Sequence, residues 1–381
     1  MSKTRVLIVG GGVAGLEAAI ALRDMAGDRV EVEMCSPRED FIYRPFAVAE
    51  PYGVSHPMRY DLRQLAERCG ADFRLAGIGS VDDEKQRAGT HDGEEIAYDH
   101  LIVACGSRLL AGVSGAVTFW GVADNGDVRD VVRELRERKL HRVVFTMPPG
   151  GSWALPMYEL ALLADSELSK AGDEDASLVI VTPEDAPLHL FGARASERVT
   201  ELLDRRGIEV IAGATPVKYD GRQLSVSPSA TVEADAVLSL PRMEGRQIGG
   251  VPHDPNGFVA VDDHGRVRGM RHAFAAGDVT SFPVKQGGVA TQQADAVAEA
   301  IAADLGREVA AEPFDPVLRG VLWTGGEPLY LSGDLAGGHG ETSSASAEPS
   351  WDGAADGKIV GRYLTPFLTS AIARPSDPGS G

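Results

Sequence analysis

The residues Arg5-Val-Leu-Ile-Val-Gly10-Gly-Gly-Val-Ala-Gly15-Leu-Glu-Ala-Ala-Ile-Ala-Leu22 decide the fold of this 381-residue chain. The all-apolar run at 6–9 is typical of a buried parallel strand. Glycines at positions 10, 12 and 15 follow in the spacing GxGxxG, and residues 16–22 are good helix formers. A strand, a glycine loop and a helix in this order predict a dinucleotide-binding unit whose helix N-terminus faces a diphosphate.

Each glycine of the motif has a separate physical task. Gly10 allows the tight turn, Gly12 lets a pyrophosphate approach the backbone, and Gly15 lets the helix pack close to the strand. We therefore expect the loop from Gly10 to Gly15, Val13 and Ala14 included, to contact the cofactor.

The next strand, at 30–34, ends at Cys35-Ser36-Pro37. An acidic residue that binds the adenosine ribose is expected near this point. Ser36 occupies that position, and a hydroxyl bonds a ribose less strongly than a carboxylate does. The first site is therefore a poor match for plain NAD.

The strand–loop–helix layout recurs at 141–164, which indicates an internal duplication. The second loop has no GxGxxG, because it reads Met147-Pro-Pro-Gly-Gly-Ser-Trp-Ala-Leu-Pro156. Pro148 and Pro149 lack the N–H groups that a diphosphate needs, and Trp153 adds bulk. The usual cradle for NAD(P)H is therefore absent or altered. Glu184, after the strand at 178–183, is placed to meet a ribose, which favours NADH over NADPH if either binds.

The charge balance excludes several classes of function. The chain has 37 Lys and Arg against 56 Asp and Glu, and 37 − 56 gives a net charge of −19. Nucleic-acid binding needs clustered basic residues, and an anionic membrane surface repels such a chain. We find no signal peptide and no apolar run of about 18 residues, so we expect a cytoplasmic protein.

The cysteines and histidines do not indicate a metal or a dithiol site. Cys35, Cys69 and Cys105 form no CxxC pair, and the nine histidines have no ligand spacing. We expect no metal, and we interpret the cysteines as small buried residues.

Three further segments carry a family resemblance. A strand ends in Ala104-Cys105-Gly106, another ends in Gly277-Asp278, and Lys285-Gln-Gly-Gly288 opens a helix that contains Gln292-Gln293. With the N-terminal motif, they resemble the FAD flavoproteins of the glutathione-reductase type, the pyridine nucleotide-disulfide oxidoreductase superfamily. The Gly-Asp strand and the Gln-Gln helix are most similar to the type II NADH:quinone and sulfide:quinone oxidoreductase branch.

The resemblance implies an α/β fold with two Rossmann-like domains and a small C-terminal region. We expect an FAD domain at 1–111 and 246–310, a second, NAD(P)H-like domain at 112–245, and an interface or flavin-covering region at 311–381. NAD(P)H remains an optional second cofactor in this scheme.

In that family the first motif binds FAD, the Gly-Asp aspartate bonds its ribityl or phosphate region, and the following helix points at the flavin N1/C2 side. Arg44, in the loop that passes over FAD, is placed to pair with the diphosphate. A helix N-terminus stabilises the negative charge of a reduced flavin. The implied FAD contacts are Gly10, Gly12, Val13, Ala14, Gly15, Ser36, Pro37, Arg44, Pro45, Ile78, Ala104, Cys105, Gly106, Gly277, Asp278, Lys285, Gly287 and Gly288.

Four residues are candidates for the chemistry, each with a structural alternative. Lys285 adds positive charge near the flavin or is a solvated loop lysine. Gln292 resembles one of the paired glutamines near the quinone site or is an exposed helix position. Trp153 and Tyr158 line the face where a nicotinamide stacks or pack between domains. Trp153 also stands where sulfide-oxidising relatives place a catalytic cysteine, which disfavours sulfide oxidation.

The C-terminal region differs in character from the rest. Residues 318–324 and 329–331 predict a hairpin around Gly325-Gly326, and 336–357 reads as a loop. The apolar stretch 358–373 predicts a helix interrupted by Pro366. Membrane association is an open alternative for it, but we favour packing on the core or on the partner of a homodimer.

Three functions remain open from the sequence. The first is an FAD-dependent oxidoreductase that transfers two electrons from NAD(P)H to a quinone-like or other small acceptor. The second is a tailoring oxidase or dehydrogenase that acts directly on an organic substrate without nicotinamide. The third is a flavin-binding redox sensor without turnover. In the first two, the partners are a small-molecule electron donor and acceptor.

Overall fold

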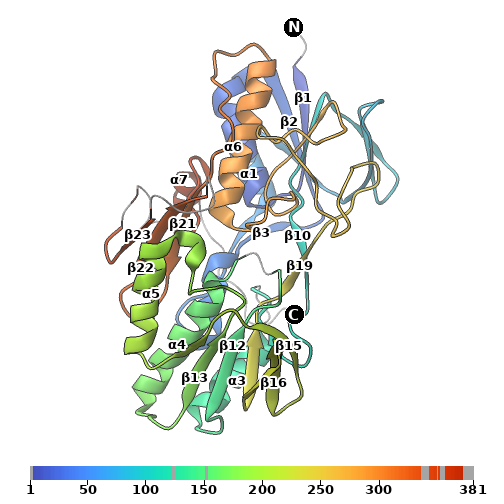
Figure 1. Cartoon of the computed structure of the whole chain (residues 1–381). Helices are drawn as coiled ribbons and strands as arrows, with labels where there is room; N and C mark the ends of the chain where they lie inside the picture. Colours follow the sequence, from blue (N-terminus) through green and yellow to red (C-terminus); the bar gives the residue numbers. More distant parts are fainter. Residues whose placement is uncertain are drawn as a thin grey trace.

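The computed structural model describes residues 3–121, 125–150, 153–335, 343–349, 351 and 357–371. The chain forms two α/β lobes, one above the other in Figure 1, and a smaller C-terminal sheet lies at their side. Each lobe has a five-stranded sheet, and all the pairs in both sheets are parallel. The α/β class and the two Rossmann-like units predicted from the sequence are therefore confirmed.

The first lobe is built on a sheet of order β20-β9-β1-β2-β5. Its strands β1, β9 and β20 are buried almost completely, as their apolar runs predict. Helices α1 and α6 lie against each other beside the sheet (Figure 1). The elements of this layer are β1 (Thr4–Val9), α1 (Val13–Ala26), β2 (Val30–Ser36), α2 (Leu62–Cys69), β5 (Asp72–Leu75), β9 (His100–Val103), β20 (Ala273–Ala275) and α6 (Gly287–Asp304).

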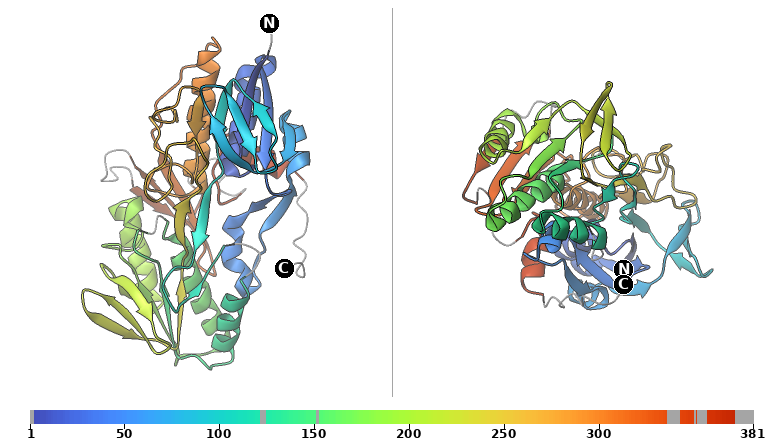
Figure 2. Two further views of the ribbon diagram at one scale, coloured as in Figure 1. Left: turned by 90° about the vertical axis from the view of Figure 1, so that its right-hand side faces the viewer. Right: turned by 90° about the horizontal axis from the view of Figure 1, so that it is seen from below.

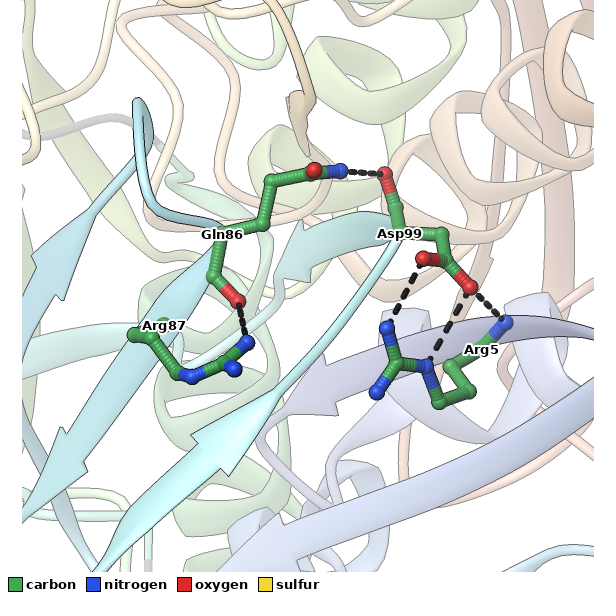
Figure 3. A network of polar contacts seen from close by, with 4 residues as sticks. All are labelled: Arg5, Gln86, Arg87 and Asp99. Atoms are coloured by element: carbon green, nitrogen blue, oxygen red, sulfur yellow. Dashed lines mark hydrogen bonds and ion pairs between the residues drawn. The ribbon is translucent and has the colours of Figure 1, made fainter.

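Smaller elements extend this lobe. They are η1 (Gly27–Arg29), the antiparallel pair of β3 (Asp40–Tyr43) and β4 (Met58–Asp61), and an antiparallel sheet of β6 (Ile78–Asp82), β7 (Arg87–Thr90) and β8 (Glu95–Ala97). The segment η2 (Arg44–Tyr52), between β3 and β4, instead packs on the second-lobe helices at Gly126–Arg136 and Leu155–Ala171. Figure 3 shows how polar contacts join the sheet of β6, β7 and β8 to the main one. Asp99 accepts hydrogen bonds from the Arg5 backbone N–H at 2.7 Å and from its Nη2 at 2.9 Å, and Gln86 Nε2 donates to the Asp99 carbonyl at 3.2 Å. These contacts fix the start of β9 beside β1.

The second lobe repeats the plan with the order β11-β18-β12-β13-β14. The helix α4 covers the central strand β12, and the short antiparallel sheet β15-β16-β17 lies at the edge of the lobe (Figure 1). The elements are β11 (Val117–Thr118), α3 (Gly126–Arg136), β12 (Arg142–Thr146), α4 (Leu155–Ala171), β13 (Ser177–Val181), η3 (His189–Phe191), α5 (Ala193–Arg205), β14 (Glu209–Ile211), β15 (Thr215–Tyr219), β16 (Gln223–Ser227), β17 (Ala230–Glu233) and β18 (Ala236–Ser239).

Two neighbouring strands connect the two lobes. β10 (Ser107–Leu110) leaves the first lobe and β19 (Arg242–Gly245) returns to it, and the two pair antiparallel. Figure 2 shows these strands running between the lobes. The predicted boundaries at 111 and 246 lie one residue beyond these strands.

The C-terminal region contacts both lobes. The predicted hairpin is confirmed, since β21 (Val317–Leu322) pairs antiparallel with β22 (Leu329–Asp334), and β23 (Ser343–Ser346) adds a third strand. This sheet packs on α4 and α6.

The helix predicted over 358–373 is wrong for most of its length. Residues 357–363 are not helical, and α7 covers Leu364–Thr369 only, with Pro366 in its first turn. The cause lies in contacts with the first lobe. Tyr43 Oη accepts from the N–H groups of Lys358 and Ile359, each at 2.8 Å, so these N–H groups face a side chain rather than a preceding turn. Residues 372 and 373 lie outside the described part. Within the described residues, no helix is both long enough and apolar enough to cross a membrane.

Candidate functional site

One continuous cavity of about 610 Å³ runs between the two lobes. Its wall includes the glycine loop after β1, the ends of β2 and β9, the loop before α6, and the carboxyl ends of β12 and β18. Ligands of open α/β sheets bind outside the carboxyl ends of the strands, where the strand order reverses. The cavity has the size and the place of a cofactor site that continues into a substrate chamber.

The glycine loop has the tight geometry that its spacing predicts. Gly10 has φ +123°, and a Cβ there would lie 2.2 Å from the Ala104 carbonyl oxygen. A Cβ on Gly15 would lie 1.9 Å from the Gly10 oxygen, whereas a Cβ on Gly12 would meet nothing within 4 Å. Gly10 and Gly15 are therefore required by the fold itself, and Gly12 leaves open space at the start of α1 for a ligand.

Charged groups gather at the first-lobe side of the cavity. Arg44 is accessible through the cavity, and burial in the surrounding protein lowers its pKa, while the nearby Asp278 acts in the opposite direction. Burial raises the pKa of the Asp278 carboxyl, and Lys285 and Arg44 partly offset this effect. Arg38 and Arg246 line the same cavity. In a chain of net charge −19, this concentration of guanidinium groups favours a ligand that carries phosphates.

Lys285 is almost fully buried, with an exposed fraction of 7%. Its Nζ donates to the Thr280 carbonyl and lies 4.0 Å from the centre of the Phe258 ring. Burial lowers the pKa of Lys285 to about 8, against the attraction of Asp278. The ammonium is thus held at the cavity wall with only part of its hydration.

The helix α6 begins at the cavity. The Gln286 side chain caps it by accepting from the Val289 N–H at 2.8 Å, and both Gln286 and Gly287 line the cavity. A Cβ on Gly287 would lie 2.8 Å from Ile359, so this glycine lets the C-terminal segment pack over the helix start. The positive end of the helix dipole therefore faces the cavity.

Sequence reasoning missed an ion pair in the cavity wall. Glu159 of α4 and Lys358 of the C-terminal segment are 1% and 8% exposed, and Lys358 Nζ donates to Glu159 Oε1. The same oxygen accepts from the Trp323 N–H at 2.8 Å, and Lys358 also lies over the Trp323 ring. The only signals in the sequence were an acidic residue beside Tyr158 and a lysine at the start of an apolar stretch.

The second-lobe end of the cavity is a mostly apolar chamber. Aromatic, aliphatic and proline side chains form its walls, and the Glu159–Lys358 pair is the charged group among them. The apolar residues are Leu109, Phe119, Trp120, Met147, Trp153, Leu155, Pro156, Leu240, Pro241, Met243 and Val321.

Most residues predicted for the cofactor meet at this cavity. The sixteen that line it are Gly10, Gly12, Val13, Ala14, Ser36, Pro37, Arg44, Pro45, Ile78, Ala104, Cys105, Gly106, Gly277, Asp278, Lys285 and Gly287. Gly15 lies behind the loop, and Gly288 lies beside the Gln286 cap. Of the residues predicted for the chemistry, Lys285 and Trp153 line the cavity, and Gln292 and Tyr158 are outside its lining.

Gln292 and Tyr158 make contacts elsewhere. The Gln292 side chain donates to the Val317 carbonyl and accepts from the Val317 N–H, each at 2.9 Å, so it joins β21 to α6. Tyr158 is fully buried, and its hydroxyl donates to Glu184 Oε2 at 2.7 Å. Both hold neighbouring elements together, and we leave them out of the proposed site.

Cys35 and Cys105 lie apart from each other, and burial favours the protonated form of both thiols. Burial raises the pKa of the Cys105 thiol to about 11 and that of the Cys35 thiol to about 12. Cys35 is the penultimate residue of β2 and Cys105 follows β9, on the opposite side of β1, so their backbones are about 10 Å apart. This separation is too large for a disulfide. Neither thiol is a ready nucleophile.

The duplicated α/β units, the glycine loop and the shared cavity define a protein of two Rossmann-like domains. The sequence pattern of the pyridine nucleotide-disulphide oxidoreductase family matches residues 4–300, and the chain belongs to this family. The chain is thus an FAD-dependent oxidoreductase, as the resemblance implied, and relatives from both branches named above confirm that resemblance.

Known relatives cover most of the chain at low identity. A sulfide-quinone reductase of Aquifex aeolicus is 26% identical over 297 residues, which are 73% of this chain and 69% of the relative. The ferredoxin–NAD(+) reductase subunit of the Pseudomonas putida benzene 1,2-dioxygenase system is 26% identical over 367 residues, 87% of this chain and 81% of the relative. An Arabidopsis thaliana internal alternative NAD(P)H-ubiquinone oxidoreductase is 21% identical over 323 residues, 74% of this chain and 62% of the relative.

The solved structures share the fold. The sulfide:quinone oxidoreductase structure from Aquifex aeolicus superposes with a TM-score of 0.80 at 22% identity, over 91% of this chain and 87% of that one. The ferredoxin reductase structure of the CYP199A2 system from Rhodopseudomonas palustris has a TM-score of 0.62 at 20% identity, over 88% of this chain and 83% of that one.

Proposed function

We propose that the chain binds FAD along the cavity and passes two electrons to a quinone-like or other small conjugated acceptor in the apolar chamber. One observation carries the proposal: the glycine loop, Arg44, Asp278 and the start of α6 line the same cavity as the chamber. A cofactor held by the first group therefore has direct access to a molecule held in the second.

The residues present fit FAD. Gly12 leaves room for a diphosphate at the N-terminus of α1, and Arg44 supplies a guanidinium. Ser36, 5% exposed, lies at the end of β2 with its hydroxyl accepting from the Arg38 N–H at 3.2 Å. The Ser36 hydroxyl can still donate a hydrogen bond to a ribose. Bound FAD would supply the redox chemistry, while the protein supplies position and electrostatics.

Lys285 and the start of α6 form the positive side of the proposed flavin site. A partly desolvated ammonium and a helix N-terminus both stabilise negative charge on a bound group. We propose that Lys285 raises the reduction potential of the flavin in this way.

The Glu159–Lys358 pair is the proposed proton source of the chamber. Two-electron reduction of a quinone-like acceptor takes up two protons. One would arrive with the electrons from bound FAD, and the other has to come from the chamber, whose walls otherwise consist largely of side chains that cannot supply it. The Lys358 ammonium can donate a hydrogen bond to an acceptor oxygen while Glu159 holds it in place. Burial lowers the pKa of Lys358, and the ion pair with Glu159 acts in the opposite direction.

The test uses the purified FAD-loaded protein under anaerobic conditions. The flavin is reduced with dithionite and mixed with 2-methyl-1,4-naphthoquinone in a stopped-flow instrument. We expect fast reoxidation in the wild type and a rate lower by about 10²-fold in Lys358→Met, the scale of a lost general acid. A flavin that the quinone does not reoxidise would exclude this function and favour the redox sensor.

A further inference from the structure

The loop after β12 is unsuited to the diphosphate of a nicotinamide dinucleotide. A Rossmann unit binds this group with the N–H groups of that loop and of the following helix. Pro148 and Pro149 lie in the loop, and Pro156 lies in the first turn of α4, so three positions lack an N–H. The N–H of Met157 already donates to the Ala154 carbonyl at 2.9 Å.

The acidic residue at the ribose position is also engaged. Glu184 follows β13, where the family's ribose ligand is expected from the sequence. Its Oε2 accepts from the Tyr158 hydroxyl at 2.7 Å and from the Thr182 hydroxyl at 2.9 Å. Burial raises the pKa of this carboxyl. Glu184 therefore ties α4 to β13 through Oε2, and this oxygen is engaged within the protein.

Side chains and the C-terminal sheet fill the space beside the loop. The rings of Trp153 and Phe191 pack with their centres 5.7 Å apart, and Phe191 is fully buried. Gly320 of β21 lies so close that an added Cβ would be 2.7 Å from Phe191 and 2.9 Å from Leu155. The C-terminal sheet thus packs on the N-terminal end of α4, where the dinucleotide would have to lie.

We infer that the second domain holds no NAD(P)H and that a small, flat, largely apolar donor of the hydroquinone type, which gives up two electrons and two protons and leaves as the quinone, occupies the chamber in alternation with the acceptor. This inference rests on the proposed function, because it identifies the donor class of the same cavity. Trp153, Trp120 and Phe119 supply flat apolar walls, and the Glu159–Lys358 pair supplies a polar contact for one hydroxyl or carbonyl oxygen. A molecule of this class needs neither a phosphate cradle nor a ribose ligand.

The test measures binding and not turnover alone. Calorimetric titration of the FAD-loaded protein with NADH and with NADPH should show no saturable heat, and anaerobic addition of either should leave the flavin oxidised while dithionite bleaches it. Saturable heat or stoichiometric bleaching with micromolar NADH or NADPH would overturn the inference. Reoxidation by the quinone tests the proposed function separately, since it starts from dithionite and needs no nicotinamide.

A substitution in the chamber wall tests whether the chamber binds 2-methyl-1,4-naphthoquinone. Binding of this probe is measured by the change that it causes in the visible spectrum of the flavin. Trp153→Ala should weaken the dissociation constant about tenfold, which corresponds to the loss of one aromatic contact. Trp153→Phe should remain close to wild type. The matched control is Trp351→Ala, because Trp351 packs on Tyr330 and is absent from the cavity lining. Equal dissociation constants for Trp153→Ala and Trp351→Ala would overturn the assignment of the chamber.

Discussion

Glu159 and Lys358 are each buried in the wall of the cavity, so each depends on the other for its stability. Removing one partner leaves a buried charge without compensation, which typically costs about 3–5 kcal/mol. We therefore expect Glu159→Gln and Lys358→Met each to lower the free energy of unfolding by about that amount, measured by urea denaturation.

The double variant shows how much of each loss in unfolding free energy comes from the broken ion pair and how much from altered packing. Glu159→Gln combined with Lys358→Met should cost clearly less than the sum of the single changes, because no unpaired charge remains. Lys85→Met is the control. It removes an exposed pair with Asp82, in which the side chains are 77% and 43% accessible, and should cost at most about 1 kcal/mol. Strictly additive single variants would contradict the coupling of the buried pair.

The proposed role of Lys285 has a distinct pH signature. Lys285→Met should lower the reduction potential of bound flavin by about 30 mV, which for a two-electron couple corresponds to about 1.4 kcal/mol. The pKa of Lys285 is lowered to about 8, so the wild type loses the same positive charge above that pH. The difference between the two proteins, measured by spectroelectrochemistry, should therefore shrink between pH 7 and pH 9. If the difference in reduction potential between the two proteins stays constant over this pH range, the substitution acts through packing and not through the charge of Lys285.

At the scale of elements, two substitutions in the glycine loop distinguish a glycine that the fold requires from a glycine that the cofactor requires. Gly15→Ala places a Cβ 1.9 Å from the Gly10 oxygen, so we expect a loss of stability of roughly 1–3 kcal/mol together with loss of FAD. Gly12→Ala meets no protein atom within 4 Å, and the φ of Gly12 is −92°, which alanine adopts readily. It should keep the wild-type melting temperature of the FAD-free protein and still bind FAD more weakly. Thermal unfolding of the FAD-free proteins and the flavin content after purification distinguish the two variants.

The elements that the sequence predicted well are those fixed by nearby residues. Gly10 and Gly15 contact each other within one loop, and the β21–β22 hairpin closes around Gly325, which has φ +77°. The sequence also predicted that Gln292 lies on a helix, but it did not predict which part of the fold its side chain contacts. Its partner, Val317, lies 25 residues further along the chain and belongs to another region of the fold.

The Glu159–Lys358 pair could not be predicted from the sequence either, because its partners are also far apart along the chain. The two residues are 199 positions apart, and an isolated lysine before an apolar stretch gives no sign of a buried partner. The residues from 358 to 363 have helix-compatible side chains, but long-range bonds to Tyr43 and Glu17 hold them in bends and turns. Tertiary contacts override local preference wherever the local signal is weak.

At the scale of the whole molecule, the C-terminal segment holds the two lobes around the cavity. Lys358 bonds to α4 of the second lobe, and the N–H groups of Tyr363 and Leu364 donate to Glu17 of α1 at 2.9 and 2.6 Å. Figure 1 shows α7 beside α1 and the C-terminal sheet beside α4. A change that loosens the Glu17 contact therefore acts on the wall of the cavity as well as on α7.

Glu17 lies beside the Asp295 carboxyl of α6, and burial raises the pKa of both carboxyls, which favours a proton on Asp295. Burial is the main cause that raises the pKa of Asp295 to about 8, with Glu17 and Glu299 acting in the same direction and Arg362 against it. Asp24 accepts from the Tyr363 hydroxyl at 3.2 Å, and Arg68 lies over the ring of Phe367 in α7. The folded protein thus holds this proton more tightly than the unfolded chain, in which the pKa of an aspartate is about 3.9.

The sign of the pH dependence follows from this difference. A carboxyl whose pKa is raised by folding contributes stability that is complete below about pH 4 and is lost as the pH rises to about 8. Asp295→Asn keeps the shape of the protonated carboxyl without the charge. We expect it to flatten the pH dependence of the unfolding free energy and to stabilise the protein at pH 8 by about 1–3 kcal/mol. Asp304→Asn, at the exposed end of the same helix, is the matched control and should leave the slope unchanged. If urea denaturation from pH 5 to pH 9 gives Asp295→Asn the wild-type slope, Asp295 does not carry this proton, and the segment over the cavity is held by its backbone bonds to Glu17 alone.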